Sequence, residues 1–315
     1  MFLFGSCMLC FMIEFHRKML ADGVRNAAFV KALKKVIVPG KSVVADIGSG
    51  TGFLAFIASS LGAKECFLYE TGDVLELSKK IAQENGINNC HFIRKHSATV
   101  KTPPRADIVI SETLGNFALE EHILENLRDA KRFLKQDGVM IPQKIRQYVV
   151  PVTSDTIFRE VQAWNDVDAK INFAAAKEMS VNNLYVRTVA GKDLYSGPDA
   201  MQQWDTIDLL GNEKSKRAGD VSWTVNAPET IHGFCLFWEC DLLPGVTLST
   251  SPSAPLTHWE QLFLPVPQPI ALKKGESLSL TIQSDSSYNV GINVMWDVES
   301  PSGKWGMDMR KGHLN

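Results

Sequence analysis

The sequence predicts an α/β protein in which a doubly wound, mostly parallel Rossmann-like sheet is followed by an antiparallel β domain. Two observations carry this prediction. Between about Lys41 and Pro142, β-branched strands alternate with helical segments, which is typical of a parallel sheet covered by helices on both faces. After Pro142, segments that alternate apolar and polar residues are separated by Gly, Ser and Pro, which indicates an antiparallel sandwich or barrel.

The chain divides into three parts by pattern. Residues 1–33 form a helical segment that breaks near Gly23, residues 34–142 form the parallel-sheet domain, and residues 143–315 form the β domain. Residues 155–186 look helical and irregular, so we expect an insertion into the β domain there. The apolar start, MFLFGSCMLCFM, is too short to cross a bilayer, and we expect no membrane association.

Composition excludes several classes of protein. The chain has 33 basic and 35 acidic residues and a net charge of −2, which argues against direct, nonspecific binding of nucleic acid. A hydrophobic fraction of 45% is ordinary for a soluble globular protein. The six cysteines form no paired CxxC knuckles, so we expect no metal site and reduced thiols in the cytoplasm.

The first strand of the predicted sheet ends in a glycine-rich turn, VVADIGSGTG. Gly48 and Gly50 let the backbone approach a ligand at a helix N-terminus. The spacing is GxGxG, not the dinucleotide pattern GxGxxG, and the preceding Asp46 suits a ligand with an ammonium group. Glu70 ends the second strand 22 residues after Gly48, where it can accept hydrogen bonds from ribose hydroxyls. These features favour S-adenosylmethionine; the alternative is exposed strand-end carboxylates beside a tight turn.

Residues 110–121, ISETLGNFALEE, follow the strand RADIVI and hold Glu112 and Glu121 with no basic residue between them. Two carboxylates gathered at a strand end suit a guanidinium, which is planar, carries five donors and keeps its charge. They would bind its fork and aim a remaining nitrogen at a methyl donor. The alternative is one strand-end carboxylate and one at a helix N-terminus, where the macrodipole favours negative charge.

The motifs VVADIGSGTG, SETLGNFALEE, THWEQ and MLADGVR together resemble those of the protein arginine methyltransferases. The family's double-glutamate pattern is met by Ser111, Glu112, Gly115 and Glu121, and its THW loop by residues 257–259. The likeness runs from about residue 16 to the C-terminus. It implies methyl transfer from S-adenosylmethionine to a guanidino nitrogen of arginine in protein or peptide substrates. It also implies a homodimer, with the helical insertion as its dimerisation arm.

The resemblance assigns catalytic and substrate roles to single residues. Asp22 and His258 are implied to pair across the domain boundary, where the imidazole would orient the hairpin or pass on the released proton. Trp259 would pack beside the substrate arginine, and Met19 would lie against the methyl-transfer site. Without the resemblance, His258 and Trp259 would be read as structural residues of the β domain.

The resemblance also implies cofactor-binding residues, and it shows where this sequence differs from the family's pattern. Arg25 would bind the cofactor's carboxylate, with His16 near the same group, and Ala98 stands where the family has an acid for the adenine amino group. The family's aromatic segment ahead of His16 is not found, and Thr113-Leu114 replaces Trp-Met. Two other readings therefore stay open. One is a folded, inactive scaffold, and the other is an enzyme for a small guanidino or amino compound.

Overall fold

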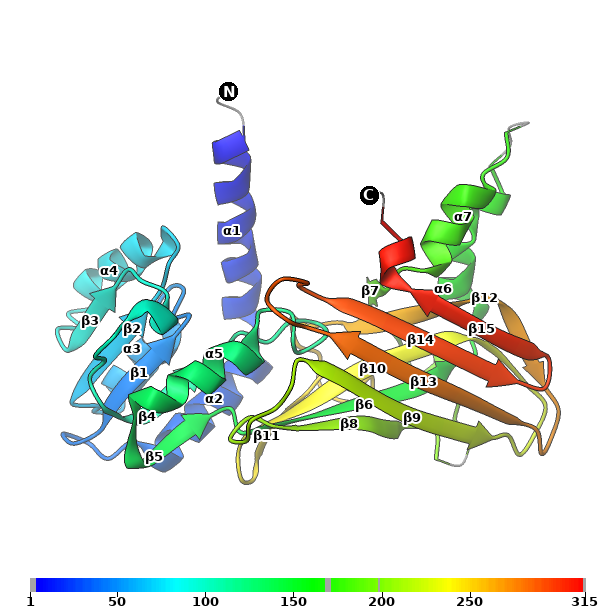
Figure 1. Ribbon diagram of the computed structural model, residues 1–315. Coiled ribbons are helices and arrows are strands. Elements are labelled where there is room, and N and C mark those ends of the chain that lie inside the picture. The colour runs from blue at the N-terminus through cyan, green and yellow to red at the C-terminus, as the bar shows by residue number, and fades with distance from the viewer. Residues whose placement is uncertain (1–3, 168–170, 198, 314–315) are drawn as a thin grey trace.

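Figure 1 shows the computed structural model, which describes residues 4–167, 171–197 and 199–313, with side chains from residue 13 onward. The parallel-sheet domain lies beside the β domain, and helix α1 (Phe4–Ala21) stands between them. No helix in the described ranges is long and apolar enough to cross a membrane.

A five-stranded parallel sheet, in the order β3-β2-β1-β4-β5, forms the first domain. Its strands are β1 (Val43–Ile47), β2 (Glu65–Tyr69), β3 (Cys90–Ile93), β4 (Ala106–Ser111) and β5 (Leu134–Ile141). The helical elements around them are α3 (Phe53–Ser60), α4 (Val74–Glu84), η1 (Ser97–Thr99), α5 (Ile123–Ala130) and η2 (Lys131–Phe133). The central strand β1 is almost wholly buried, as expected for a strand covered on both faces.

The strand register brings three predicted site residues to one edge of the sheet. Ile47 of β1 pairs with Tyr69 of β2 and with Ser111 of β4. Gly48, Glu70 and Glu112 each follow directly after one of these paired residues. Because the strands run parallel, all three lie at the carboxyl edge, where the chain reverses its strand order and ligands bind in such sheets.

Two helices precede the sheet. Helix α1 extends back through the apolar start to Phe4, and α2 (Gly23–Val36) follows it. The predicted break falls at Asp22, whose side chain caps α2 by accepting a 2.9 Å hydrogen bond from the backbone N–H of Arg25. Phe29 and Leu33 of α2 are buried in the core of the parallel-sheet domain.

The β domain consists of two antiparallel sheets. A six-stranded sheet holds β6 (Lys144–Val152), β7 (Tyr185–Arg187), β8 (Gln202–Asp208), β10 (Glu229–Leu243), β11 (Val246–Ser249) and β12 (Gln261–Leu272). A four-stranded sheet holds β9 (Lys216–Thr224), β13 (Ser277–Asp285), β14 (Asn293–Ser300) and β15 (Gly303–Asp308). Strand β13 alternates buried and exposed residues, as the sequence pattern predicts for a sheet with one solvated face. Short turns η4 (Gly191–Asp193) and η5 (Met309–Lys311) complete the domain.

The helical insertion projects from the end of this domain (Figure 1). It contains α6 (Asp155–Val161), η3 (Ala163–Asn165) and α7 (Ala174–Val181). The last residues of the predicted insertion differ, because residues 185–187 form β7 and pair with β12. Helix α5 begins at Ile123, directly after His122, whose φ of 56° is left-handed.

Gly52 permits a close contact at the start of α3, and this contact makes a testable prediction. Its φ is +84°, and an added Cβ would clash with Oγ of Ser78 and would lie 2.6 Å from Cζ of Phe56. We expect Gly52→Ala to lower the free energy of unfolding by roughly 2–4 kcal/mol, from overpacking and the left-handed backbone together. Urea denaturation measures the change.

Gly40 supplies the matched control. Its φ is +71°, but a Cβ there would meet nothing within 4 Å. Gly40→Ala should therefore cost only about 1–2 kcal/mol for the left-handed backbone. Equal losses from the two substitutions would show that the contacts with Ser78 and Phe56 add nothing.

Candidate active site

A cavity of about 230 Å³ opens at the carboxyl edge of the parallel sheet. Among its walls are nine predicted residues: His16, Met19, Arg25, Asp46, Gly48, Gly50, Glu70, Glu112 and Glu121. Phe15, which the sequence analysis did not single out, also lines it from α1. The structure thus brings together residues from the N-terminal helices and from the ends of three strands.

Asp46 and Glu70 form the acidic floor of this cavity. Asp46 is buried, and its Oδ2 accepts a 3.1 Å hydrogen bond from the backbone N–H of Ala55. Burial, reinforced by the charge of Glu70, raises the pKa of Asp46 to about 7. The backbone N–H groups of Gly50, Thr71 and Gly72 donate to the Glu70 carboxylate at 2.7–3.0 Å. A buried acid of this kind suits a ligand that brings its own positive charge.

The glycine turn is covered by α1. An added Cβ at Gly50 would lie 2.9 Å from Cε1 of His16, so only glycine lets the imidazole pack here. Burial lowers the pKa of His16, which favours the neutral ring. Its Nδ1 is buried and has no hydrogen-bond partner among the described residues. A polar atom left in this state fits a site that is completed by a ligand.

A smaller cavity of about 150 Å³ continues past Glu70 and is lined by Lys95, His96 and Ser97, among others. Ala98, which the resemblance places at the adenine, is exposed on η1 and does not line it. The short 3₁₀ turn directs Ala98 outward while its neighbour Ser97 is buried. Lys95, His96 and Ser97, which precede Ala98, are the residues of this segment that line the cavity.

Arg25 forms an ion pair with Glu112 at the wall of this cavity. Its Nε donates to Oε2 of Glu112 at 2.8 Å, and its Nη2 donates to the same oxygen. Its Nη1 donates to Oδ1 of Asn26 at 2.9 Å. Both partners of the pair are nearly fully buried. Pairing with Arg25 stabilises Glu112, because a buried carboxylate without a charged partner is costly in free energy.

Glu121 completes the pair of predicted carboxylates but has no ion-pair partner among the described residues. Glu121 is exposed to solvent, yet its carboxyl group lies among many protein atoms and near three other carboxylates. Withdrawal from water, followed by the charges of Glu112, Glu120 and Glu70, raises the pKa of Glu121 to about 7. Glu112 and Glu121 therefore share a cavity while having different electrostatic environments.

Two tryptophans of the β domain hold the loop between these carboxylates. Trp259 Nε1 donates to the carbonyl of Leu114 at 2.8 Å. Trp238 Nε1 donates to the carbonyls of Gly115 and Asn116 at 3.1 and 3.2 Å. The indoles meet edge to face, with centroids 5.0 Å apart. Trp259 is buried, and its N–H is used to hold the loop.

Sequence reasoning missed two of these supports, Trp238 and Glu120. Glu120 accepts hydrogen bonds from the backbone N–H groups of Asn116 and Phe117 at 3.1 and 3.2 Å. It therefore closes the loop from inside. The adjacent acids Glu120 and Glu121 thus have different roles, because Glu120 braces the loop whereas Glu121 lines the cavity. No local sequence signal separates them.

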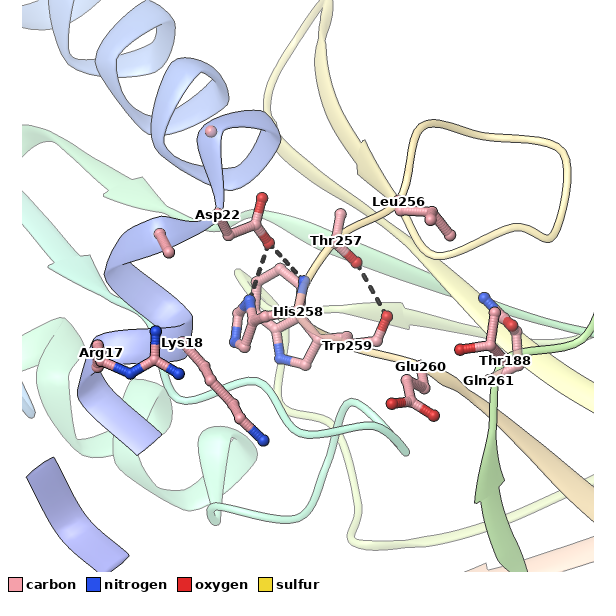
Figure 2. A pocket seen from close by; sticks show the side chains of 12 residues that line it. Arg17, Lys18, Asp22, Thr188, Leu256, Thr257, His258, Trp259, Glu260 and Gln261 are labelled. Atoms are coloured by element: carbon pink, nitrogen blue, oxygen red, sulfur yellow. Dashed lines mark hydrogen bonds and ion pairs between the residues drawn. The ribbon is translucent and has the colours of Figure 1, made fainter. Parts of the chain in front are cut away.

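Asp22 and His258 meet across the domain boundary, as Figure 2 shows. Asp22 Oδ2 lies 2.9 Å from Nδ1 of the imidazole and accepts a 2.7 Å bond from the His258 backbone N–H. Burial alone would raise the pKa of Asp22, but the hydrogen bonds from Arg25 and His258 outweigh it and lower the pKa. The ionised carboxylate joins the start of α2 to the THW loop.

These features define a class of protein, a methyltransferase with a Rossmann-like cofactor domain. Residues 40–205 match the family model described as methyltransferase domain, and residues 144–300 match the arginine methyltransferase oligomerization subdomain. The chain belongs to the protein arginine methyltransferase family.

Similar proteins span most of this chain. It is 26% identical over 306 residues to protein arginine N-methyltransferase 2 of Xenopus tropicalis, covering 90% of this chain and 70% of that protein. It is 28% identical over 298 residues to the arginine N(omega)-methyltransferase of Streptomyces achromogenes subsp. streptozoticus, covering 89% and 78%. The histone-arginine methyltransferase CARMER of Anopheles gambiae is longer, and the chain spans 47% of it at 27% identity.

Solved structures share the fold. A chain of the Trypanosoma brucei PRMT1 enzyme-prozyme heterotetrameric complex with AdoHcy superposes with a TM-score of 0.84 at 22% identity, covering 93% of this chain and 96% of that chain. Arabidopsis thaliana protein arginine methyltransferase 10 superposes with a TM-score of 0.77 at 20% identity, covering 93% and 97%.

The unequal environments of the two carboxylates predict opposite effects on stability. Glu112→Gln leaves the Arg25 charge buried without a charged partner, and we expect a loss of about 3 kcal/mol in the free energy of unfolding. Glu121→Gln removes a charge from negative surroundings and should raise the melting temperature slightly. Thermal unfolding without ligand tests both.

The effect at Glu121 has a defined pH dependence. Its pKa of about 7 exceeds the ordinary 4.5, so between these values the folded protein keeps a proton that the unfolded chain has lost. Stability of the wild type therefore falls as pH rises through this window, and the gain from Glu121→Gln shrinks toward pH 4.5. Exposed Glu84→Gln is the control and should change little. A loss from Glu121→Gln equal to that from Glu112→Gln would indicate a second structural ion pair.

Proposed function

We propose that this protein transfers a methyl group from S-adenosylmethionine to a guanidino nitrogen of arginine in a protein or peptide. The observation that carries the proposal is the position of Glu112 and Glu121 in the same cavity as Asp46 and Glu70. The cavity thus holds two pairs of carboxyl side chains, and each pair can face one of two cationic partners. The names of the relatives agree with this reaction.

The residues present fit the cofactor. Asp46 suits its ammonium group, the fixed carboxylate of Glu70 suits the ribose hydroxyls, and the cavity beside Ser97 has room for a base. The unpartnered Nδ1 of His16 offers one further polar contact over the glycine turn. Bound S-adenosylmethionine supplies an electrophilic methyl group on a sulfonium.

The chain's own carboxylates bind and orient the acceptor. Arg25 uses Oε2 of Glu112, whereas Oε1 accepts only a 3.3 Å bond from the backbone N–H of Leu114 among the described residues. Oε1 and the carboxylate of Glu121 are therefore the two acceptors left for a guanidinium. Binding of that cation favours the ionised form of Glu121, whose pKa is about 7, so a proton leaves as the acceptor enters. The two carboxylates then hold the fork and draw its positive charge toward them.

The Asp22–His258 pair is placed to hold a proton afterwards. Nδ1 of the imidazole faces Asp22, so Nε2 is the nitrogen that remains for exchange. This role rests on the contact with Asp22 and on the position of His258 in the wall of a second cavity, shown in Figure 2.

Methyl transfer from labelled S-adenosylmethionine to arginine peptides tests the proposed reaction. Glu121→Gln should lower kcat by on the order of 10²–10³ because one preorganised electrostatic contact is lost at the transition state. Affinity for S-adenosylhomocysteine, measured by calorimetry, should be unchanged, since cofactor contacts lie at Asp46 and Glu70. Glu84→Gln is the control and should retain full activity. Activity that survives at Glu121→Gln would refute the clamp, and a wild type inert toward every guanidine would favour a scaffold.

We further propose a homodimer formed through the helical insertion, the arm of residues 155–186. The match to an oligomerization subdomain supports this assembly. The arm also exposes large apolar side chains, and Trp164, Val167 and Ile171 are each 41–65% exposed. Exposed apolar groups gathered on a projecting element mark an interaction surface.

Sedimentation tests the arm. The double change Trp164→Glu and Ile171→Asp should give a folded monomer, because two charges would be buried in the interface. The control is Leu210→Glu, which alters a side chain 49% exposed in the turn after β8 and should leave the dimer intact. A wild type that sediments as a monomer at micromolar concentration would contradict the arm while leaving the proposed chemistry standing.

A further inference from the structure

A second and larger cavity, of about 490 Å³, lies where α1 and α2 meet the loop of His258 (Figure 2). Its walls are the last turn of α1, the start of α2 and the loop that precedes β12. Among the residues that line it are Arg17, Lys18, Leu256, His258, Trp259 and Glu260.

The two cavities are neighbours along α1. Phe15, His16 and Met19 of α1 line the first cavity, whereas Lys18 and Ala21 line the second. The Phe15 ring meets the His258 ring edge to face at a centroid distance of 6.5 Å, so one wall residue of each cavity lies beside the other. The second cavity is therefore the space next to the one that holds Glu112 and Glu121.

Lys18 and Glu260 are the unpaired charges of the second cavity. Arg17 is bound by Glu14, with Nε and Oε2 2.7 Å apart, and Asp22 is bound by His258. Neither Lys18 nor Glu260 has an ion-pair partner among the described residues. Figure 2 shows them reaching the cavity from opposite sides, Lys18 from α1 and Glu260 from the loop. Leu256, which is 74% exposed, adds an apolar edge.

We infer that the second cavity receives a carboxylate of the acceptor at Lys18. The acceptor then carries a carboxylate close to its guanidine, either the α-carboxylate of free arginine or an acidic side chain beside the target arginine of a peptide. A segment containing only arginine and glycine would bring a further positive charge toward Lys18, which repels it. Glu260 is placed for an ammonium group, which free arginine has and an internal peptide residue lacks. The inference rests on the proposed function and names its substrate class.

Matched acceptors test the inference. End-blocked Gly-Gly-Arg-Gly-Gly is compared with the same peptide carrying Asp on either side of Arg, and L-arginine is compared with agmatine, which lacks the carboxylate. We expect KM to be about fivefold lower for the carboxylate-bearing member of at least one pair, the size of a single ion pair that keeps contact with water. Lys18→Met should abolish this difference, and Lys18→Glu should reverse it. Lys31→Met, on the exposed face of α2, is the control and should preserve it.

The pattern of results identifies the source of the carboxylate. Preference for L-arginine over agmatine, together with a raised KM for L-arginine in Glu260→Gln, indicates the free amino acid. Preference for the Asp peptides that is unaffected by Glu260→Gln indicates an acidic flanking residue. Equal KM values within both pairs, or a preference that survives Lys18→Met, would overturn the inference while the proposed function stands.

Methyl transfer to none of the acceptors would count against the proposed function instead. Calorimetry of the same acceptors, with the protein saturated in S-adenosylhomocysteine, then decides the inference separately. Tighter binding of carboxylate-bearing acceptors that is lost in Lys18→Met supports it, and equal binding refutes it.

Discussion

Four carboxylates share one cavity, and their mutual repulsion is the constraint on which the rest of the site depends. Asp46, Glu70, Glu112 and Glu121 line the same space, and Arg25 is the one arginine or lysine among the residues that line it. Such a group is stable only if each acid is stabilised by hydrogen bonds, by a charge partner or by protonation. The structure uses all three, with backbone donors at Glu70, Arg25 at Glu112 and raised pKa values at Asp46 and Glu121.

A second constraint is that the loop between Glu112 and Glu121 must keep its position when no ligand is bound. It is held from the β domain, by indole N–H groups of Trp238 and Trp259 that bind backbone carbonyls. The β domain therefore does more than cover the sheet. Its tryptophans position a loop that begins at the end of β4, and the Asp22–His258 pair ties the same domain to the start of α2. These contacts hold the part of the site proposed to bind the cofactor in a fixed position relative to the part proposed to bind the acceptor.

Much of the site was predictable because its residues stand at strand ends. Gly48, Glu70 and Glu112 follow strands whose β-branched pattern is clear, and parallel strands bring their carboxyl ends to one edge. The roles of Arg25, Ala98 and Trp259 were not predictable in the same way. Each depends on which neighbour a side chain meets, namely Glu112, solvent and the Leu114 carbonyl. Spacing along the chain contains no information on these contacts.

By itself, the sequence determined the alternation of strands and helices, the change to antiparallel strands after Pro142 and the gathering of acids at strand ends. These follow from local periodicity, which acts over a few residues. Only the tertiary structure decided that Arg25 neutralises Glu112, that Glu120 braces the loop, and that Lys18 and Glu260 remain unpaired around a second cavity. The physical reason is that charge pairing and burial depend on distances between residues far apart in the chain, and folding sets those distances.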